Sequence, residues 1–189
     1  MIRDLILKNR SYRRFYGDFK IERSVLNELI DLARLSPSGK NLQPLKFIIV
    51  NDEKINAEVF STLAWAGYLK DWDGPEESER PTAYVVMTVD KNLTMGTPAI
   101  DEGIACQSIL LGAVERGLGG CIIQSVKKKE LAEILSILES LEVALVIALG
   151  KPKEEVQLLP MKDDDIKYYR DEKGVHYVPK RNLNDIIIK

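Results

Sequence analysis

RLSPSGKNLQPLKFIIV, residues 34–50, joins the end of a helical pattern to a buried strand through a short polar loop. Upstream of the loop, apolar side chains recur at helical spacing over residues 22–35, and SPSG follows as a helix stop. Downstream, KFIIV at residues 46–50 is a short run rich in β-branched and aromatic residues, which is typical of a buried strand. The stretch therefore predicts a helix, a tight loop and a core strand in immediate succession.

The loop of this stretch, residues 36–44, concentrates side chains that can bind a flat, polar ligand. Ser38, Asn41 and Gln43 surround Gly39 with hydrogen-bond donors and acceptors, and a glycine lets the backbone approach a ligand closely. The simpler interpretation is a helix stop followed by a loop without a binding role. The loop alone does not decide between the two.

Outward from this stretch, the sequence mixes helical and strand patterns. Residues 98–116 are apolar on nearly all sides, begin near a proline and end before Gly117, which predicts a core helix. We expect one mixed α and β domain over residues 1–189, because the chain shows no repeats, low-complexity segments or interdomain linker. The other expected elements are a first helix carrying Ile2, Leu5, Ile6 and Leu7, helical pieces over 53–70, a polar loop over 71–81, strands at 83–89, 120–123 and 142–150, a helix at 127–138, and a hairpin at 168–177.

Composition and charge exclude several classes of partner. The chain carries 27 Lys and Arg against 29 Asp and Glu, with a pI of about 5.6, so it has no general basic field for nucleic acid or anionic lipid. The N-terminus lacks the apolar stretch of a signal peptide, and VALVIAL at 143–149 is far too short to span a bilayer. We therefore expect a soluble, cytoplasmic protein that binds neither nucleic acid nor membrane.

The residues that usually carry metal or nucleophilic chemistry are scarce. Cys106 and Cys121 are too far apart for a CxxC site, and His176 is the only histidine. A zinc site or a Ser-His-Asp triad is hard to assemble from these residues, so we expect no metal. Demanding chemistry would need an organic cofactor.

NRSYRRF, residues 9–15, places Arg10, Arg13 and Arg14 beside the hydroxyls of Ser11 and Tyr12. Clustered arginines near a helix end most often form a solvated face. Here the neighbouring hydroxyls favour a phosphate or polyol ligand, because guanidinium groups form strong charge-assisted hydrogen bonds to such groups.

Two further stretches carry weaker signals. RGLGGCIIQS at 116–125 contains glycines that could bind a phosphate or could simply end a helix, and it is not a GxGxxG fingerprint. YVPKRNL at 177–183 places Lys180 and Arg181 near the expected start of a last short helix. Two cations oppose the helix dipole there, which makes sense if an anion lies between them and the helix amides.

In this order and at these spacings, three stretches resemble the nitroreductase family of FMN-dependent enzymes. They are NRSYRRF at 9–15, RLSPSGKNLQPLKFIIV at 34–50 and DEGIACQSILLGAVERGLGG at 101–120. The resemblance covers essentially the whole chain. It implies an α+β fold with a central, mostly antiparallel sheet flanked by helices, and an interlocked homodimer with FMN at each subunit interface.

The resemblance also assigns roles within the flavin site. It implies that Arg10 and Ser11 bind the phosphate and ribityl oxygens of FMN. Arg13 is implied to lie near flavin N1 and O2, where its fixed positive charge favours the reduced ring electrostatically. The other implied contacts are the loop residues Pro37, Ser38, Gly39 and Asn41 from the partner subunit, the stretch Ile122, Ile123, Gln124 and Ser125 against the flavin ring, and Lys180 and Arg181 on the phosphate.

Residues 61–80 match no general motif of the family, so we expect them to determine the shape of the substrate pocket. Trp65, Tyr68 and Trp72 could cover the exposed face of the flavin, although Trp65 and Tyr68 could equally pack a helix onto the core.

The implied activity is transfer of hydride from NADH or NADPH through flavin N5 to a small oxidised acceptor of nitroaromatic, quinone or enone type. Two alternatives stay open. One is a flavin-binding sensor or FMN-storage module without turnover. The other is an α/β protein whose arginines bind a nucleotide or an acidic partner.

Overall fold

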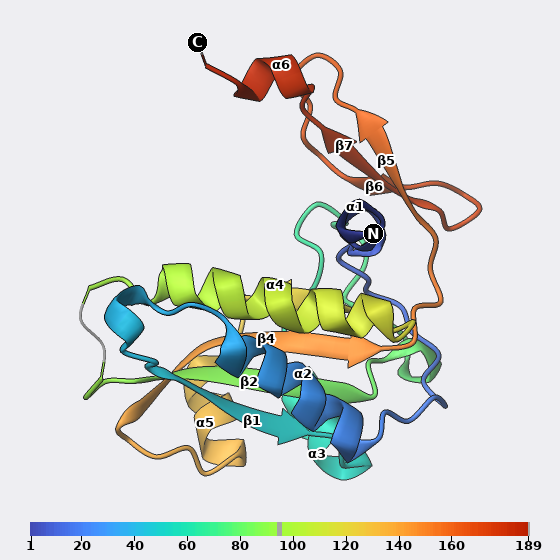
Figure 1. The fold of residues 1–189 in the computed structure, drawn as a ribbon. Coiled ribbons are helices and arrows are strands. Elements are labelled where there is room, and N and C mark those ends of the chain that lie inside the picture. Colours follow the sequence, from blue (N-terminus) through green and yellow to red (C-terminus); the bar gives the residue numbers. More distant parts are fainter. Residues whose placement is uncertain (94–95, 189) are drawn as a thin grey trace.

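The central sheet has four strands in the order β1-β2-β4-β3, and every neighbouring pair is antiparallel (Figure 1). The computed structural model describes residues 1–93 and 96–188. β2 and β4 lie in the middle of the sheet and are buried along most of their length, as their apolar sequences require. The strands are β1 (Leu45–Val50), β2 (Ala83–Asp90), β3 (Gly119–Ile123) and β4 (Leu141–Gly150).

Helices cover both faces of this sheet because alternate strand residues point to opposite sides. The face carrying Val85 and Ile147 packs against α2 and α4, and the face carrying Val86 and Val146 packs against α3 and α5. Two apolar layers therefore enclose the sheet. The helices are α2 (Arg23–Leu35), α3 (Glu53–Ser61), α4 (Ala99–Glu115) and α5 (Lys128–Ile134).

The first helix and the C-terminal elements both lie outside these layers. α1 (Ile2–Lys8) has no buried residue, and beyond it lies a second, small sheet in the order β5-β7-β6 (Figure 1). β5 runs parallel to β7, and β6 and β7 form an antiparallel hairpin. The remaining elements are β5 (Val156–Pro160), β6 (Tyr169–Arg170), β7 (His176–Lys180), α6 (Leu183–Ile186) and the 3-10 turns η1 (Gly39–Asn41) and η2 (Glu77–Glu79).

Most expected elements are confirmed, and their ends fall within a few residues of the prediction. The expected helical pieces over 53–70 are wrong beyond Ser61. There the chain leaves the helix to bond with residues 125–127: Ala64 donates to the Ser125 carbonyl, and Thr62 accepts from the Lys127 amide. The helix expected at 127–138 ends at Ile134. β5 was not foreseen.

The GLGG glycines, residues 117–120, fulfil packing requirements rather than forming an open phosphate loop. Gly117 ends α4 with φ of 70°, a conformation that favours glycine. A Cβ on Gly119 would lie 2.5 Å from the Tyr12 ring, and a Cβ on Gly120 would lie 2.4 Å from the Ala148 carbonyl oxygen. Glycine at position 119 lets the arginine-rich segment, residues 9–15, lie directly on β3, and glycine at position 120 lets β3 pack closely against β4.

The α+β class with a mostly antiparallel sheet flanked by helices is thus confirmed. The interlocked homodimer and the assignment of residues 1–189 to one domain stay predictions. Among the helices of residues 1–93 and 96–188, none combines the length and the apolar character needed to cross a bilayer.

Candidate functional site

The arginine-rich segment is fixed between β3 and the chain that leaves β4. Tyr12 donates its amide to the Gly120 carbonyl at 3.0 Å, and Tyr16 donates to the Lys151 carbonyl at 2.9 Å. Between these bonds, Phe15 is fully buried against Gly150, where a Cβ would lie 2.6 Å from the ring. This apolar anchor holds the residues on either side of it in register.

The Arg13 side chain is buried, with 9% of its surface exposed. Its Nη1 donates to the Ser11 carbonyl at 3.1 Å and lies 3.3 Å from His176 Nε2. The guanidinium also stacks over the Tyr168 ring, 4.7 Å from the centroid. Two residues of the C-terminal hairpin region therefore determine where this charge points.

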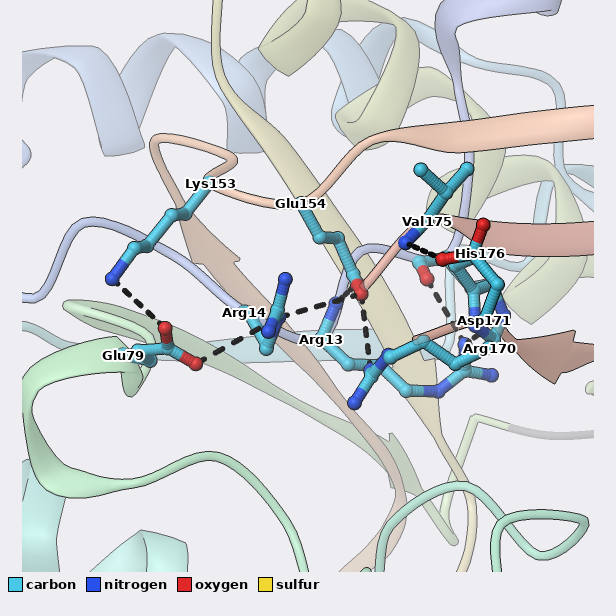
Figure 2. A network of polar contacts seen from close by, with 10 residues as sticks. Arg13, Arg14, Glu79, Lys153, Glu154, Arg170, Asp171, Val175 and His176 are labelled. Atoms are coloured by element: carbon cyan, nitrogen blue, oxygen red, sulfur yellow. Dashed lines mark hydrogen bonds and ion pairs between the residues drawn. The ribbon is translucent and has the colours of Figure 1, made fainter. Parts of the chain in front are cut away.

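Glu154 is the anion at the centre of this region (Figure 2). Its side chain is fully buried: Oε1 accepts the backbone N–H of Arg13, and Oε2 accepts Nη2 of Arg170 at 3.2 Å. Arg14 Nε lies 4.0 Å from the same Oε2. A buried carboxylate needs such partners, because an unpaired charge away from water is costly.

The outer part of the network involves Glu79. This carboxylate pairs with Lys153 at 2.8 Å and with Arg14 at 3.7 Å (Figure 2). The cations of the whole network, Arg13, Arg14, Lys153 and Arg170, outnumber its anions, Glu79, Glu154 and Asp171. The network therefore keeps an excess of positive charge that suits an anionic or electron-rich ligand.

A cavity of about 200 Å³ opens beside Arg13. The same cavity is lined by all four residues of the predicted ring-binding stretch, Ile122, Ile123, Gln124 and Ser125, and by Trp65. β3 pairs with β4 only as far as Ile123, so Gln124 and Ser125 lie beyond the last ladder pair. The structure thus brings Arg13 and residues 122–125 together, as the sequence led us to expect.

The three aromatic residues of the proposed cover lie in different environments. Trp65 is buried and lines the cavity, and Phe60 is 5.7 Å from its ring. Tyr68 is 46% exposed and contacts the Tyr168 ring at 4.9 Å. Trp72 lies beneath the Arg170 guanidinium, 4.7 Å away. The C-terminal hairpin region holds the loop over residues 61–80 through these contacts. Of the three aromatic side chains, only Trp65 lines the cavity.

The loop at 36–44 lines a different cavity, of about 330 Å³, that includes Pro37 and Ser38. Ser38 donates its hydroxyl to Asp101 at 2.5 Å, and the Gly39 amide donates to the same carboxylate at 3.0 Å. Asn41 is exposed, with φ of 55°. Within one subunit this loop does not reach the cavity beside Arg13.

Arg10, Ser11, Lys180 and Arg181 do not line the Arg13 cavity either. Arg10 Nη2 donates to the Ile6 carbonyl at 2.7 Å, while its buried Nε finds no partner among the described residues. Arg181 pairs with Asp164 at 2.8 Å, just before α6. No contact between described residues joins Arg10 to the two C-terminal cations.

Residues 6–151 match the model of the nitroreductase family, which is most of the chain. The chain belongs to the nitroreductase family. The match includes the arginine-rich segment, the loop at 36–44 and the stretch at 122–125, and it ends just before Glu154.

Individual relatives agree with this assignment. A protein of Archaeoglobus fulgidus, provisionally named NADH dehydrogenase/NAD(P)H nitroreductase, is 28% identical over 80% of this chain and 85% of its own length. The iodotyrosine deiodinase of Thermotoga neapolitana is 25% identical over 89% of this chain and 97% of its own. A solved structure of an FMN-dependent nitroreductase from Clostridium difficile superposes with a TM-score of 0.63 at 25% identity, covering 92% and 94% of the two chains.

The thiols of this nitroreductase are unsuited to nucleophilic chemistry. Cys121 lines the cavity, but burial raises the pKa of its thiol, and burial likewise raises the pKa of Cys106 to about 12. Both cysteines are therefore protonated at neutral pH, and the thiolate is the reactive form.

Sequence reasoning missed Glu154, Tyr168, Arg170 and His176, the residues that surround the arginines. They lie in irregular chain or short strands, where neither periodicity nor a motif marks them. Glu154 meets Arg13 across 141 positions, and such a contact leaves no local trace in the sequence. The one available signal was that His176 is the only histidine, placed in a predicted hairpin.

Replacing Glu154 by Gln should destabilise the protein by about 3 kcal/mol, because the arginines would lose the buried carboxylate that neutralises them. Urea unfolding at fixed protein concentration measures this change. Glu155→Gln is the matched control: that neighbouring side chain is exposed, and its removal should change stability by less than about 0.5 kcal/mol. Equal midpoints for Glu154→Gln and Glu155→Gln would contradict the role given to Glu154.

Proposed function

We propose that this nitroreductase is an FMN-dependent oxidoreductase that passes hydride from NADH or NADPH through flavin N5 to a small oxidised acceptor. The observation that carries the proposal is the cavity shared by Arg13 and residues 122–125. The names of the Archaeoglobus and Clostridium relatives, which specify NAD(P)H and FMN, support it. When bound, FMN supplies the two-electron chemistry, and the protein supplies orientation and charge.

The residues of the cavity fit a flavin ring. Arg13 provides a fixed positive charge that is prepared before any ligand binds, since Ser11 and His176 already hold its Nη1. The amides of Gln124 and Ser125 lie past the end of the β3 ladder, where a backbone N–H can be directed at a ring nitrogen. The apolar wall from Trp65 and Ile123 suits a flat aromatic ring.

In this proposal the remaining cations, Arg10, Lys180 and Arg181, bind the phosphate end of FMN. The Arg10 Nε atom is buried without a partner among the described residues, which is costly unless a ligand accepts its hydrogen. Burial lowers the pKa of Arg10, yet an arginine keeps its charge in proteins. We assign Arg10 and Ser11 to the phosphate and ribityl oxygens, with Lys180 and Arg181 as further phosphate partners.

A second subunit completes the site in this proposal. The cavity beside Arg13 measures about 200 Å³, below the roughly 300–1,000 Å³ typical of ligand pockets, so one chain forms only part of the pocket. The chain also exposes apolar side chains at both ends, a sign of an interaction surface. They are Ile2, Ile6 and Leu7 of α1, and Leu183, Ile186, Ile187 and Ile188 near the C-terminus.

The loop at 36–44 is the part of the partner that we place against the flavin. The loop is held rigidly by Asp101, which leaves Asn41 exposed in a defined conformation. Because this loop lies outside the Arg13 cavity of its own chain, Pro37, Ser38, Gly39 and Asn41 are free to serve the site of the other subunit. Trp65 would border the bound acceptor. Tyr68 and Trp72 would lie at the edge of the loop over residues 61–80.

Purified protein should be yellow, and anaerobic addition of NADH or NADPH should bleach the flavin absorbance. Adding a nitroaromatic or quinone acceptor should then restore the absorbance and yield the reduced acceptor. Bound flavin that neither nucleotide bleaches would support a sensor or FMN-storage module instead. A colourless protein that does not bind added FMN would contradict the proposal.

Mixing inactive Arg10→Ala and Asn41→Ala subunits should restore part of the activity after joint denaturation and refolding. A heterodimer would recover one intact site, because Arg10 and Asn41 serve each site from different chains. Refolding each variant alone is the control and should restore nothing. A heterodimer confirmed by native mass spectrometry but without activity would contradict the shared site.

A further inference from the structure

His176 is the only histidine of the chain and lies in β7, outside the residues that match the family model. Its side chain is 1% exposed, and its backbone N–H donates to the Glu155 carbonyl at 2.9 Å. The ring is 5.2 Å from the Tyr168 ring, and its Nε2 is 3.3 Å from Arg13 Nη1. Figure 2 shows it beside Arg170, Asp171 and Val175.

The contact with Arg13 fixes the tautomer of His176. A guanidinium can only donate hydrogen bonds, so Nε2 must accept, and the single ring proton of a neutral imidazole then lies on Nδ1. Among the described residues, Nδ1 has no hydrogen-bond partner. The ring therefore offers Arg13 a neutral acceptor and no competing charge.

The surroundings keep the imidazole neutral. Burial lowers the pKa of His176 to about 4, and the positive charges of Arg13, Arg170 and Arg14 add to this effect. The other polar groups nearby are Glu154, which binds Arg170 and the Arg13 backbone, and the Tyr168 hydroxyl, which accepts the Tyr68 amide. Protonation would turn the acceptor into a donor facing Arg13.

We propose that His176 is a positioning residue that directs the Arg13 guanidinium into the cavity. The Nη1 atom is held from two sides, by the Ser11 carbonyl and by His176 Nε2, and the Tyr168 ring covers one face. Arg13 lines the cavity and makes no other side-chain hydrogen bond within residues 1–93 and 96–188, so its Nε and Nη2 hydrogens are not committed to another residue. The importance of this for turnover rests on the proposed function, in which Arg13 stabilises the reduced flavin.

Two substitutions separate hydrogen bonding from packing. His176→Phe keeps an aromatic ring against Tyr168 but removes the acceptor, whereas His176→Gln loses the ring and keeps an acceptor oxygen. If His176 positions Arg13, the rate of flavin reduction at saturating NADH falls by about tenfold in His176→Phe and stays within a few fold of wild type in His176→Gln. If His176 only fills space, the order of the two variants is reversed.

FMN affinity is measured in the same variants by fluorescence titration. Because Arg13 acts mainly on the reduced ring, the dissociation constant should change much less than the reduction rate in His176→Phe. An equal loss of the flavin reduction rate in His176→Phe and His176→Gln, or no loss in either, would overturn the proposal.

A cofactor-free measurement keeps the inference separate from the proposed function. Selective ¹⁵N-histidine labelling gives signals from one imidazole, and these should show a proton on Nδ1 at neutral pH and a ring that titrates with a pKa of about 4. Arg13→Met should raise the pKa of His176, because one of the lowering charges is removed. A proton on Nε2, or an unchanged pKa in Arg13→Met, would overturn the inference. If the tautomer is as expected but the protein binds no FMN, the proposed function fails and the pairing stands.

Discussion

The carboxylate of Glu154 is the constraint on which the site depends. It is fully buried and can persist there only because the Arg13 amide, Arg170 and Arg14 converge on it. These partners come from the N-terminal segment and from the small C-terminal sheet, so one charge joins the two ends of the chain. Without this charge, three nearby guanidinium groups would repel one another in a poorly solvated region.

Two parts of the molecule together fix the arginine-rich segment: the layers around the central sheet and the small C-terminal sheet. The layers around the central sheet fix the backbone of the arginine-rich segment, with Phe15 packed against Gly150 and Tyr12 against Gly119. The C-terminal sheet, beyond the family match, then directs the side chains through His176, Tyr168 and Arg170. The part of the chain that matches the family model thus contains the arginine-rich segment, and the C-terminal sheet supplies the contacts that orient its side chains.

Much of the fold could be predicted because its signals are local. The helical spacing over 22–35 and the unbroken apolar run VALVIAL at 143–149 each specify an element without knowledge of the rest. β5 was missed because Val156–Pro160 is short, half-exposed and ends in proline, and its pairing with β7 depends on a hairpin further along the chain. The end of α3 at Ser61 was missed because bonds to residues 125–127, which are distant in sequence, override helix propensity.

The roles given to the site residues stay predictions, but part of their grouping in space could be expected from local motifs. Arg13 and residues 122–125 stand in recognisable motifs, and they do share a cavity. Glu154 and His176 stand in no motif, because their roles arise only when distant segments pack together. The roles of Lys180 and Arg181 stay predictions, since each lies away from the cavity within one chain.

An anaerobic redox titration of bound FMN in wild type, Arg13→Gln and Arg14→Gln tests most directly whether the buried charge of Arg13 serves the flavin. In Arg13→Gln the two-electron potential should fall by roughly 30 mV or more, since about 1.4 kcal/mol of lost stabilisation of the reduced state corresponds to that shift. In Arg14→Gln it should stay near the wild-type value, because Arg14 pairs with Glu79 and does not line the cavity. Identical potentials in wild type and Arg13→Gln, with FMN bound in both, would contradict this role.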